Sequence, residues 1–322
     1  MLFRSAFSLA SPAGRRAGLS ILIFHRVLPE PDSLFPGEVD ARRFDALMGW
    51  MQDWFNVLPL CEAVKRLQRG SLPARAAAIT FDDGYADNHE VALPILQRHG
   101  LSATFFIATG FLNGGRMFND TVIETVRRCA EPALDLTRLG LGLHDLRSLD
   151  ARRQAIAALL DSIKYQPLAQ RLETVSAMAE TADVTLPDDL MMTARQVKAL
   201  HEAGMEIGAH TVRHPILARL ETEAAEQEIA DSRDYLQELL GEPVTLFAYP
   251  NGKPEADYRC EHAAMARRLG FLAAVSTTWG VARGSSDCFQ LPRFTPWERP
   301  RWRFGLNLLR NYGRTPAVAA PE

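Results

Sequence analysis

Two adjacent carboxylates, Asp82 and Asp83, follow an apolar run and stand directly before a glycine in the stretch AAITFDDGYADNHE, residues 77–90. Like charges this close repel each other unless a cation lies beside them. A bound dication would remove the repulsion, because one aspartate could ligate it while the other stays free to take a proton from water. An aspartate pair before a glycine is also typical of a turn that caps a helix, so the pair alone does not establish catalysis.

His210 and His214 could supply further metal ligands, because two histidines four residues apart can face one direction where the backbone turns. With one aspartate they form a set of two imidazoles and one carboxylate, which leaves a coordination position open for water. Such an open set is typical of catalytic zinc sites, whereas structural zinc sites are normally closed by four protein ligands. His-x-x-x-His also arises by chance on surface helices, so the interpretation depends on both motifs occurring together.

The elements that must position these residues are short apolar runs that alternate with helical patterns. Eight strands are predicted, at 19–24, 57–58, 76–81, 103–107, 205–209, 245–248, 272–276 and 290–294. Because most of them are followed by a helix, the pattern favours a parallel α/β sheet, either a closed or nearly closed barrel or an open doubly wound sheet. In both architectures reactive groups gather where strands end, which is where Asp82 and His210 lie.

The stretch 113–190 breaks this pattern, since it shows mainly helical periodicity and no convincing strand. It predicts a helical insertion packed on the main fold. We therefore expect an N-terminal segment over 1–18, a barrel over 19–300 and a C-terminal tail over 301–322, of which the last residues, TPAVAAPE, are expected to be loose.

The composition is that of an ordinary globular protein, with 322 residues of which 47% are hydrophobic and 23% charged. The net charge of −3 argues against a broad nucleic-acid-binding surface. No apolar run reaches the roughly 20 residues that a transmembrane helix needs. Ser8, Ser11 and Pro12 interrupt the only N-terminal stretch that resembles a signal peptide, so we expect a cytoplasmic rather than an exported protein. The sequence indicates no particular oligomeric state.

The run Thr80–Gly84 (TFDDG) resembles the first motif of the polysaccharide deacetylases, carbohydrate esterases of family four that contain a NodB-homology domain. The run His210–His214 (HTVRH) resembles their second motif, H-[ST]-x-x-H, and Phe247–Gly252 (FAYPNG) resembles the third more loosely. The likeness covers roughly 19–110 and 193–294 and leaves the insertion out.

The opening ILIFH, residues 21–25, is similar to the branch of this family that acts on exopolysaccharides and poly-N-acetylglucosamine. The resemblance implies a distorted (β/α) barrel of about seven to eight parallel strands, and metal-dependent removal of N-acetyl groups from a carbohydrate substrate. Asp82 would be the general base, and a divalent metal, usually zinc, would be held by Asp83, His210 and His214. A backbone N–H would help to hold the oxyanion in the turn formed by Tyr249, Pro250 and Asn251.

The chain departs from the family pattern at two catalytic positions. The third motif usually carries an arginine that orients the base and a tyrosine, whereas this chain has Ala248 and Asn251. Arg293 could supply the missing guanidinium, or it could form a surface or interface ion pair. The family's late histidine acid is absent, and His25 is our candidate for that role, with a buried structural histidine as the alternative.

Two other classes of function therefore stay open. One is a deformylase or O-acetyl esterase that acts with the same site on a lipid-linked sugar. The other is a non-catalytic glycan-binding protein with a decayed site, which Ala248 would favour and the intact aspartates and histidines disfavour. Aromatic faces suit carbohydrate rings, and the candidates for stacking, each of which could equally be a core residue, are Phe118, Trp279 and Trp297.

Overall fold

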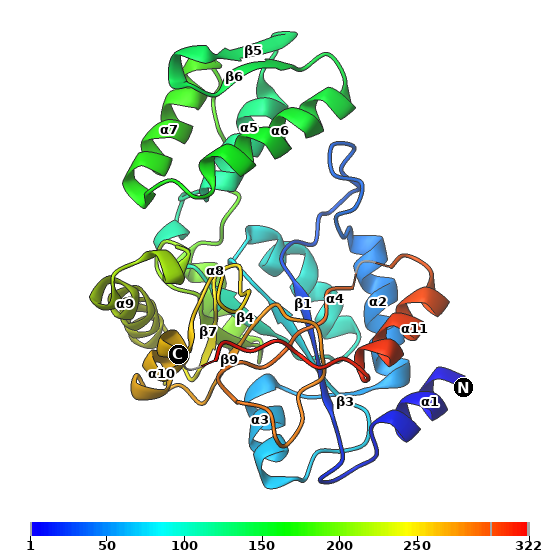
Figure 1. The fold of residues 1–322 in the computed structure, drawn as a ribbon. Helices are drawn as coiled ribbons and strands as arrows, with labels where there is room; N and C mark the ends of the chain where they lie inside the picture. The colour runs from blue at the N-terminus through cyan, green and yellow to red at the C-terminus, as the bar shows by residue number, and fades with distance from the viewer. Residues whose placement is uncertain (1, 297, 321–322) are drawn as a thin grey trace.

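A computed structural model describes residues 2–296 and 298–320 (Figure 1). Its centre is a sheet of seven parallel strands: β1 (Leu19–Phe24), β2 (Asn56–Val57), β3 (Ala76–Phe81), β4 (Thr104–Ile107), β7 (Glu206–Ala209), β8 (Leu246–Ala248) and β9 (Ala273–Val275). The strand order is β1-β3-β4-β7-β8-β9, and β2 pairs with the start of β3. Seven of the eight predicted strands are therefore confirmed.

The eighth predicted strand, 290–294, is wrong as a strand but still links the two ends of the sheet. The Leu291 N–H donates to the Ala274 carbonyl of β9 at 2.9 Å, and the Phe294 N–H donates to the Ile21 carbonyl of β1 at 2.7 Å. Pro292 lacks the N–H that a continuous ladder needs, so the segment makes single bridges instead. The parallel sheet thus curls toward a barrel, as the sequence predicts.

Eight helices surround this sheet in the described chain: α1 (Leu2–Ala10), α2 (Ala41–Trp54), α3 (Leu60–Arg69), α4 (Leu93–Arg98), α8 (Ala194–Glu202), α9 (Thr222–Leu240), α10 (Cys260–Arg268) and α11 (Arg301–Asn311). Helices α5 (Phe118–Arg128), α6 (Leu149–Ile163) and α7 (Leu168–Thr181) belong to the insertion (Figure 1). Local sequence explains several ends. Helix α8 begins at a capping box formed by Thr193 and Gln196, as predicted. Helix α3 ends at Gly70, whose φ of 64° closes the helix in the left-handed conformation.

Strand β3 shows how the sheet directs side chains toward the site. Its odd-numbered residues Ala77, Ile79 and Phe81 join the core shared with helices α2 and α4. Ala76 and Ala78 belong to a separate core that also contains Phe106 and Val275, from strands β4 and β9. Because side chains alternate along a strand, the residue after β3 at an even position, Asp82, continues the second set.

The insertion is mainly helical, as predicted, but it also contains a β-hairpin that the sequence pattern did not indicate. Strands β5 (Ala133–Leu136) and β6 (Gly142–Asp145) pair antiparallel beside helices α5, α6 and α7. Leu134 and Leu136 are buried while their neighbours are exposed, a two-residue alternation too short to stand out among the helical patterns. Figure 1 shows the insertion as a separate layer above the sheet.

The chain ends pack against the barrel, and the prediction that 301–322 is only a tail is wrong, because 301–311 form a packed helix. Helix α11 buries Phe304 and Leu308, which recur at helical spacing with Tyr312. Phe7 of α1 is fully buried, and its ring lies 6.2 Å from that of Tyr312. Residues 321 and 322 lie outside the described part. Within that part, no helix combines the length and hydrophobicity that a bilayer crossing requires.

Candidate metal centre and active site

Asp83, His210 and His214 lie together, although β3 and β7 bring them from distant parts of the sequence. The Oδ1 atom of Asp83 lies 3.3 Å from Nε2 of His210 and 3.4 Å from Nε2 of His214. One ligand atom from each residue lies within 4.8 Å of the others. The three predicted ligands therefore converge on one point at the carboxyl ends of the strands.

Unusual backbone conformations aim these side chains. Asp83, Thr211 and His214 have φ values of 76°, 62° and 51°, a region that residues other than glycine rarely adopt. Neighbouring contacts hold the loop in this shape: Thr211 Oγ1 accepts the His214 N–H at 3.1 Å, and Glu228 accepts two loop N–H groups at 2.8 and 3.0 Å. Strain of this kind persists where the surrounding structure enforces it, and it clusters at functional sites.

The donor atoms fit a dication. The Nδ1 atom of His210 lies 2.7 Å from the Ala248 carbonyl, which can only accept, so Nδ1 carries the proton and Nε2 turns a lone pair toward Asp83. The Asp83 Oδ1 is buried and lacks a hydrogen-bond partner in the described chain. A lone pair and a carboxylate oxygen that face each other repel unless a cation or a proton lies between them, and two imidazoles with one carboxylate are donors that zinc accepts.

The electrostatics of the two histidines differ. Burial lowers the pKa of His214 to about 4, which keeps this imidazole neutral and available as a ligand. Burial also lowers the pKa of His210, but the charge of Asp82 and the contact with Asp83 outweigh it, and the net shift is upward. Without a cation, a proton on His210 would therefore take over part of the charge compensation.

Asp82 lies beside the metal set and is bound by Arg293. Two guanidinium nitrogens donate to the two carboxylate oxygens at 2.7 Å each, and both side chains are buried. The Arg293 Nε donates to the Ser276 carbonyl at 2.8 Å, which fixes the guanidinium plane. The pair lies inside the curled sheet, so the alternative of a surface or interface ion pair is wrong.

The bidentate contact sets the charge of Asp82. Burial raises the pKa of its carboxyl, but the charge of Arg293 and its hydrogen bonds outweigh burial, so the pKa lies below its usual value. Asp82 Oδ2 is 4.0 Å from His210 Nε2, farther than the Asp83 oxygen. Asp82 is thus an ionised carboxylate next to the ligand set rather than part of it.

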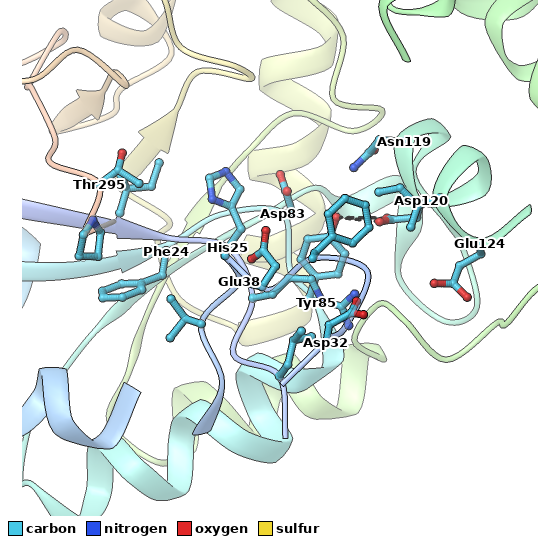
Figure 2. A pocket seen from close by; sticks show the side chains of 18 of the residues that line it. Phe24, His25, Asp32, Glu38, Asp83, Tyr85, Asn119, Asp120, Glu124 and Thr295 are labelled. Atoms are coloured by element: carbon cyan, nitrogen blue, oxygen red, sulfur yellow. Dashed lines mark hydrogen bonds between the residues drawn. The ribbon is translucent and has the colours of Figure 1, made fainter. Parts of the chain in front are cut away.

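His25 lies at the mouth of the site and is exposed, which excludes the alternative of a buried structural histidine. Its carbonyl accepts a hydrogen bond from the Asn88 side chain at 2.8 Å, which fixes the backbone after β1. Figure 2 shows its ring standing beside Asp83.

In the turn after β8, the N–H of Tyr249 cannot hold the oxyanion as we expected. The Tyr249 N–H donates to the Val275 carbonyl at 3.2 Å, so it belongs to the sheet and cannot hold an oxyanion. Pro250 has no N–H. Asn251 lines the cleft with a φ of 58°, and its N–H has no partner among the described residues. Asn251 is therefore the member of the turn that could donate to substrate.

A cleft of ≈ 520 Å³ joins these residues to the insertion. The insertion supplies the opposite wall: Met117, Phe118, Asn119, Ala157, Leu160, Asp161 and Lys164. Sequence reasoning missed Asp161 and Lys164, because nothing in a helical stretch indicates which side faces a distant site. Phe118 lines the cleft as proposed, whereas Trp279 packs on Phe294 with ring centroids 5.1 Å apart. Trp297 lies outside the described residues.

A side pocket of ≈ 290 Å³ shares His25, Asp83 and Asn119 with this cleft (Figure 2). In its wall the Tyr85 hydroxyl donates to both oxygens of Asp120 at 3.1 and 3.2 Å. Burial, opposed by Arg26 and supported by the charge of Asp83, raises the pKa of Asp120 to about 7. The sequence showed Asp120 only as a residue near the start of a helix, and no pattern indicated its contact with Tyr85.

Comparisons with known proteins agree with this arrangement. The sequence profile of the polysaccharide deacetylase family matches residues 69–163 and 173–273. The match includes much of 113–190, which we expected to lie outside the likeness. YxkH of Bacillus subtilis, a protein named for the same family, is 23% identical over 279 residues, which are 86% of this chain and 71% of YxkH.

Solved structures share the fold. A deacetylase of Streptococcus pyogenes, PplD in complex with acetate, is 22% identical with a TM-score of 0.61 and covers 92% of this chain and 98% of its own. IcaB from Ammonifex degensii is 16% identical, with a TM-score of 0.55 and coverage of 94% and 99%. A de-N-acetylase from Aggregatibacter actinomycetemcomitans is 16% identical, with a TM-score of 0.58 and coverage of 91% and 99%. With its profile match, its curled parallel sheet and its two aspartates and two histidines, this chain belongs to the polysaccharide deacetylase family.

Proposed function

We propose that this chain removes N-acetyl groups from an amino-sugar polysaccharide or its precursor, by hydrolysis that depends on a divalent cation, with zinc preferred. The observation that carries the proposal is that the two adjacent aspartates have different partners. Asp83 faces two imidazoles with an unpartnered oxygen, while Asp82 beside it is held ionised by Arg293. This difference suits Asp83 to bind a metal ion and Asp82 to act as a general base.

Asp83, His210 and His214 would hold the cation. When bound, it supplies Lewis acidity that polarises the acyl carbonyl and makes water a better nucleophile near neutral pH. The support for zinc is the donor set of two imidazole nitrogens and one carboxylate oxygen.

Asp82 would accept the proton of the attacking water. For this it must be ionised, and Arg293 stabilises the ionised form through two hydrogen bonds of 2.7 Å. The same contact fixes the carboxylate plane, so the base does not need to reorganise during the reaction.

Asn251 and His25 would act on the other atoms of the amide. The Asn251 N–H is free to donate to the carbonyl oxygen as negative charge develops there. His25 would give a proton to the sugar nitrogen as the C–N bond breaks, which releases acetate and leaves an amine on the sugar. Its exposure lets it recover a proton from solvent.

The cleft supports a glycan as substrate. It is open, ≈ 520 Å³ in volume, and walled by the insertion opposite the aspartates. Phe118 offers an aromatic face, and Lys164 and Asp161 offer polar contacts to hydroxyl groups.

The rival substrates differ in the acid that they release. Purified protein should be incubated with N-acetylglucosamine oligomers, with finished polymer, with O-acetylated glycan and with a formamide-bearing lipid-linked sugar. We expect acetate from an N-acetyl substrate and none from the same substrate with Asp82→Asn. Formate without acetate would establish the deformylase instead, and acetate from O-acetyl substrates alone would establish the esterase. Glycan and metal binding without turnover of any substrate would favour the non-catalytic alternative.

A further inference from the structure

A second hollow, of ≈ 730 Å³, lies at the end of the barrel where the strands begin. It is bordered by the turn before β1, the end of α3 and the loop after Ala282, a residue that pairs with Leu19. The catalytic cleft opens at the other ends of the same strands. This hollow therefore takes no part in the proposed chemistry.

Four arginines line the hollow, and no carboxylate is among its lining residues in the described chain: Arg15, Arg16, Arg69 and Arg283. All four are exposed. Arg283 donates to the Tyr312 carbonyl at 2.9 Å, whereas the other three have no hydrogen bond or ion pair within the described residues. Like charges gathered on one surface repel one another, and an anionic ligand would offset this.

The backbone that carries the arginines is fixed. The Gly14 N–H donates to the Leu72 carbonyl at 2.9 Å, and the Ala17 N–H closes a turn onto the Gly14 carbonyl at 2.9 Å. The stem of Arg15 lies across Gly70, where an added Cβ would come within 2.7 Å of its Cγ. The site is therefore a built surface whose charges do not depend on a mobile loop.

Apolar side chains flank this basic surface. Leu2 and Leu9 of α1 are 84% and 86% exposed, whereas Phe7 of the same helix is fully buried. Residues seven apart lie on one face of a helix, so the two leucines point outward together. Leu9 itself lines the hollow, which joins the apolar and the basic surface into one face.

We propose that this face, defined by Leu2, Leu9, Arg15, Arg16, Arg69 and Arg283, docks on an anionic phospholipid surface. The arginines would bind headgroup phosphates, and the leucines would enter the boundary between headgroups and acyl chains. Arginine suits phosphate because its planar guanidinium can donate two parallel hydrogen bonds. Figure 1 shows α1 and α3 at the foot of the sheet and the insertion at its head. Docking in this way turns the catalytic cleft toward the aqueous side.

The test is co-sedimentation of the full chain with vesicles of phosphatidylcholine alone or mixed with phosphatidylglycerol. We expect binding to the mixed vesicles only, weakened by salt. Because each arginine near a charged membrane contributes about fivefold to binding, Arg15→Glu with Arg16→Glu should weaken it by at least roughly tenfold. Leu9→Ser should weaken it while leaving the salt dependence unchanged.

Arg195→Glu is the matched control, because Arg195 is an exposed arginine on α8, outside the hollow, and it has no ion pair in the described chain. It should bind vesicles as the unchanged chain does, and every variant should keep its deacetylase rate and melting temperature. Equal binding to neutral vesicles, no binding to the mixed ones, or equal weakening by Arg195→Glu would overturn the proposal. So would binding of inorganic phosphate without vesicle binding, which would make the hollow a site for soluble anions.

Discussion

Arg293 and Asp82 are 211 residues apart in the sequence, yet the guanidinium of one binds both carboxylate oxygens of the other at 2.7 Å. The third motif of the family usually carries an arginine that orients the base, whereas this chain has Ala248, and we propose that Arg293 supplies the guanidinium instead. The segment that carries Arg293 also bridges β9 and β1. One short stretch of chain therefore both links the edges of the sheet and orients the proposed base.

This relationship predicts a shift in the pH dependence of activity. Arg293 holds the pKa of Asp82 below its usual value, so its removal should raise that pKa and move the acidic limb of the kcat/KM profile to higher pH. Arg293→Ala leaves a buried carboxylate unpaired and should cost about 3–5 kcal/mol of stability. Arg293→Lys keeps the charge and should shift the limb less.

Arg267→Gln is the control, because Arg267 forms an exposed ion pair with Asp287 at 3.3 Å. It should leave the profile in place. An acidic limb that stays where it was in both Arg293 variants would mean that Arg293 has only a structural role.

His25 should contribute through proton transfer rather than metal binding. His25→Ala should lower kcat by about 10²–10⁴-fold, the usual loss when a general acid is removed, while the metal content stays unchanged. Exposure of the ring means that folding should be unaffected, which thermal unfolding can verify. Turnover equal to that of the unchanged chain would remove His25 from the mechanism and leave the acid to another group.

Asn251 should act through its backbone. Its φ of 58° suits glycine, so Asn251→Gly keeps the N–H and the turn and should retain kcat within roughly threefold. Asn251→Val should reduce kcat strongly, because a β-branched residue resists this conformation. If Asn251→Gly abolishes acetate release while the protein stays folded, the side chain and not the N–H makes the important contact.

The raised pKa of Asp120 should make the free energy of unfolding depend on pH. Burial raises its pKa from 3.8 to about 7, so its contribution to stability is complete below about pH 4 and is lost as pH rises through about 7. In Asp120→Asn this decline, on the order of a few kcal/mol, should disappear. Denaturant unfolding across this range should be done with a chelator, because a cation would offset the charge of Asp83. Parallel pH profiles for the two proteins would contradict the prediction.

Much of the barrel could be predicted because its signals are local. The buried run of β3 ends at Asp82, and strand alternation sends that side chain to the same side as Ala76 and Ala78. The capping box at Thr193 marks the start of α8 through contacts within one turn. The positions of Asp83, His210 and His214 could be predicted because the two motifs that contain them stand directly after strands.

The remaining features depend on contacts that no local pattern records. The contact of Tyr85 with Asp120 joins the first motif to the insertion and is specified only by the packing of α5. Tyr249 could be excluded as a donor only once its N–H was seen in the ladder with β9. Helix α11 was missed because three arginines interrupt its apolar pattern, which made the stretch resemble a polar tail.

The most direct measurement of the central claim compares Asp82→Asn with Asp83→Asn for metal content and acetate release. Asp82→Asn should keep about one divalent ion per chain and lose turnover, whereas Asp83→Asn should lose both. The two changes are chemically identical and one residue apart, so each serves as the control for the other. Loss of metal from both variants to the same extent, or turnover that survives Asp82→Asn, would contradict the division of roles between the two aspartates.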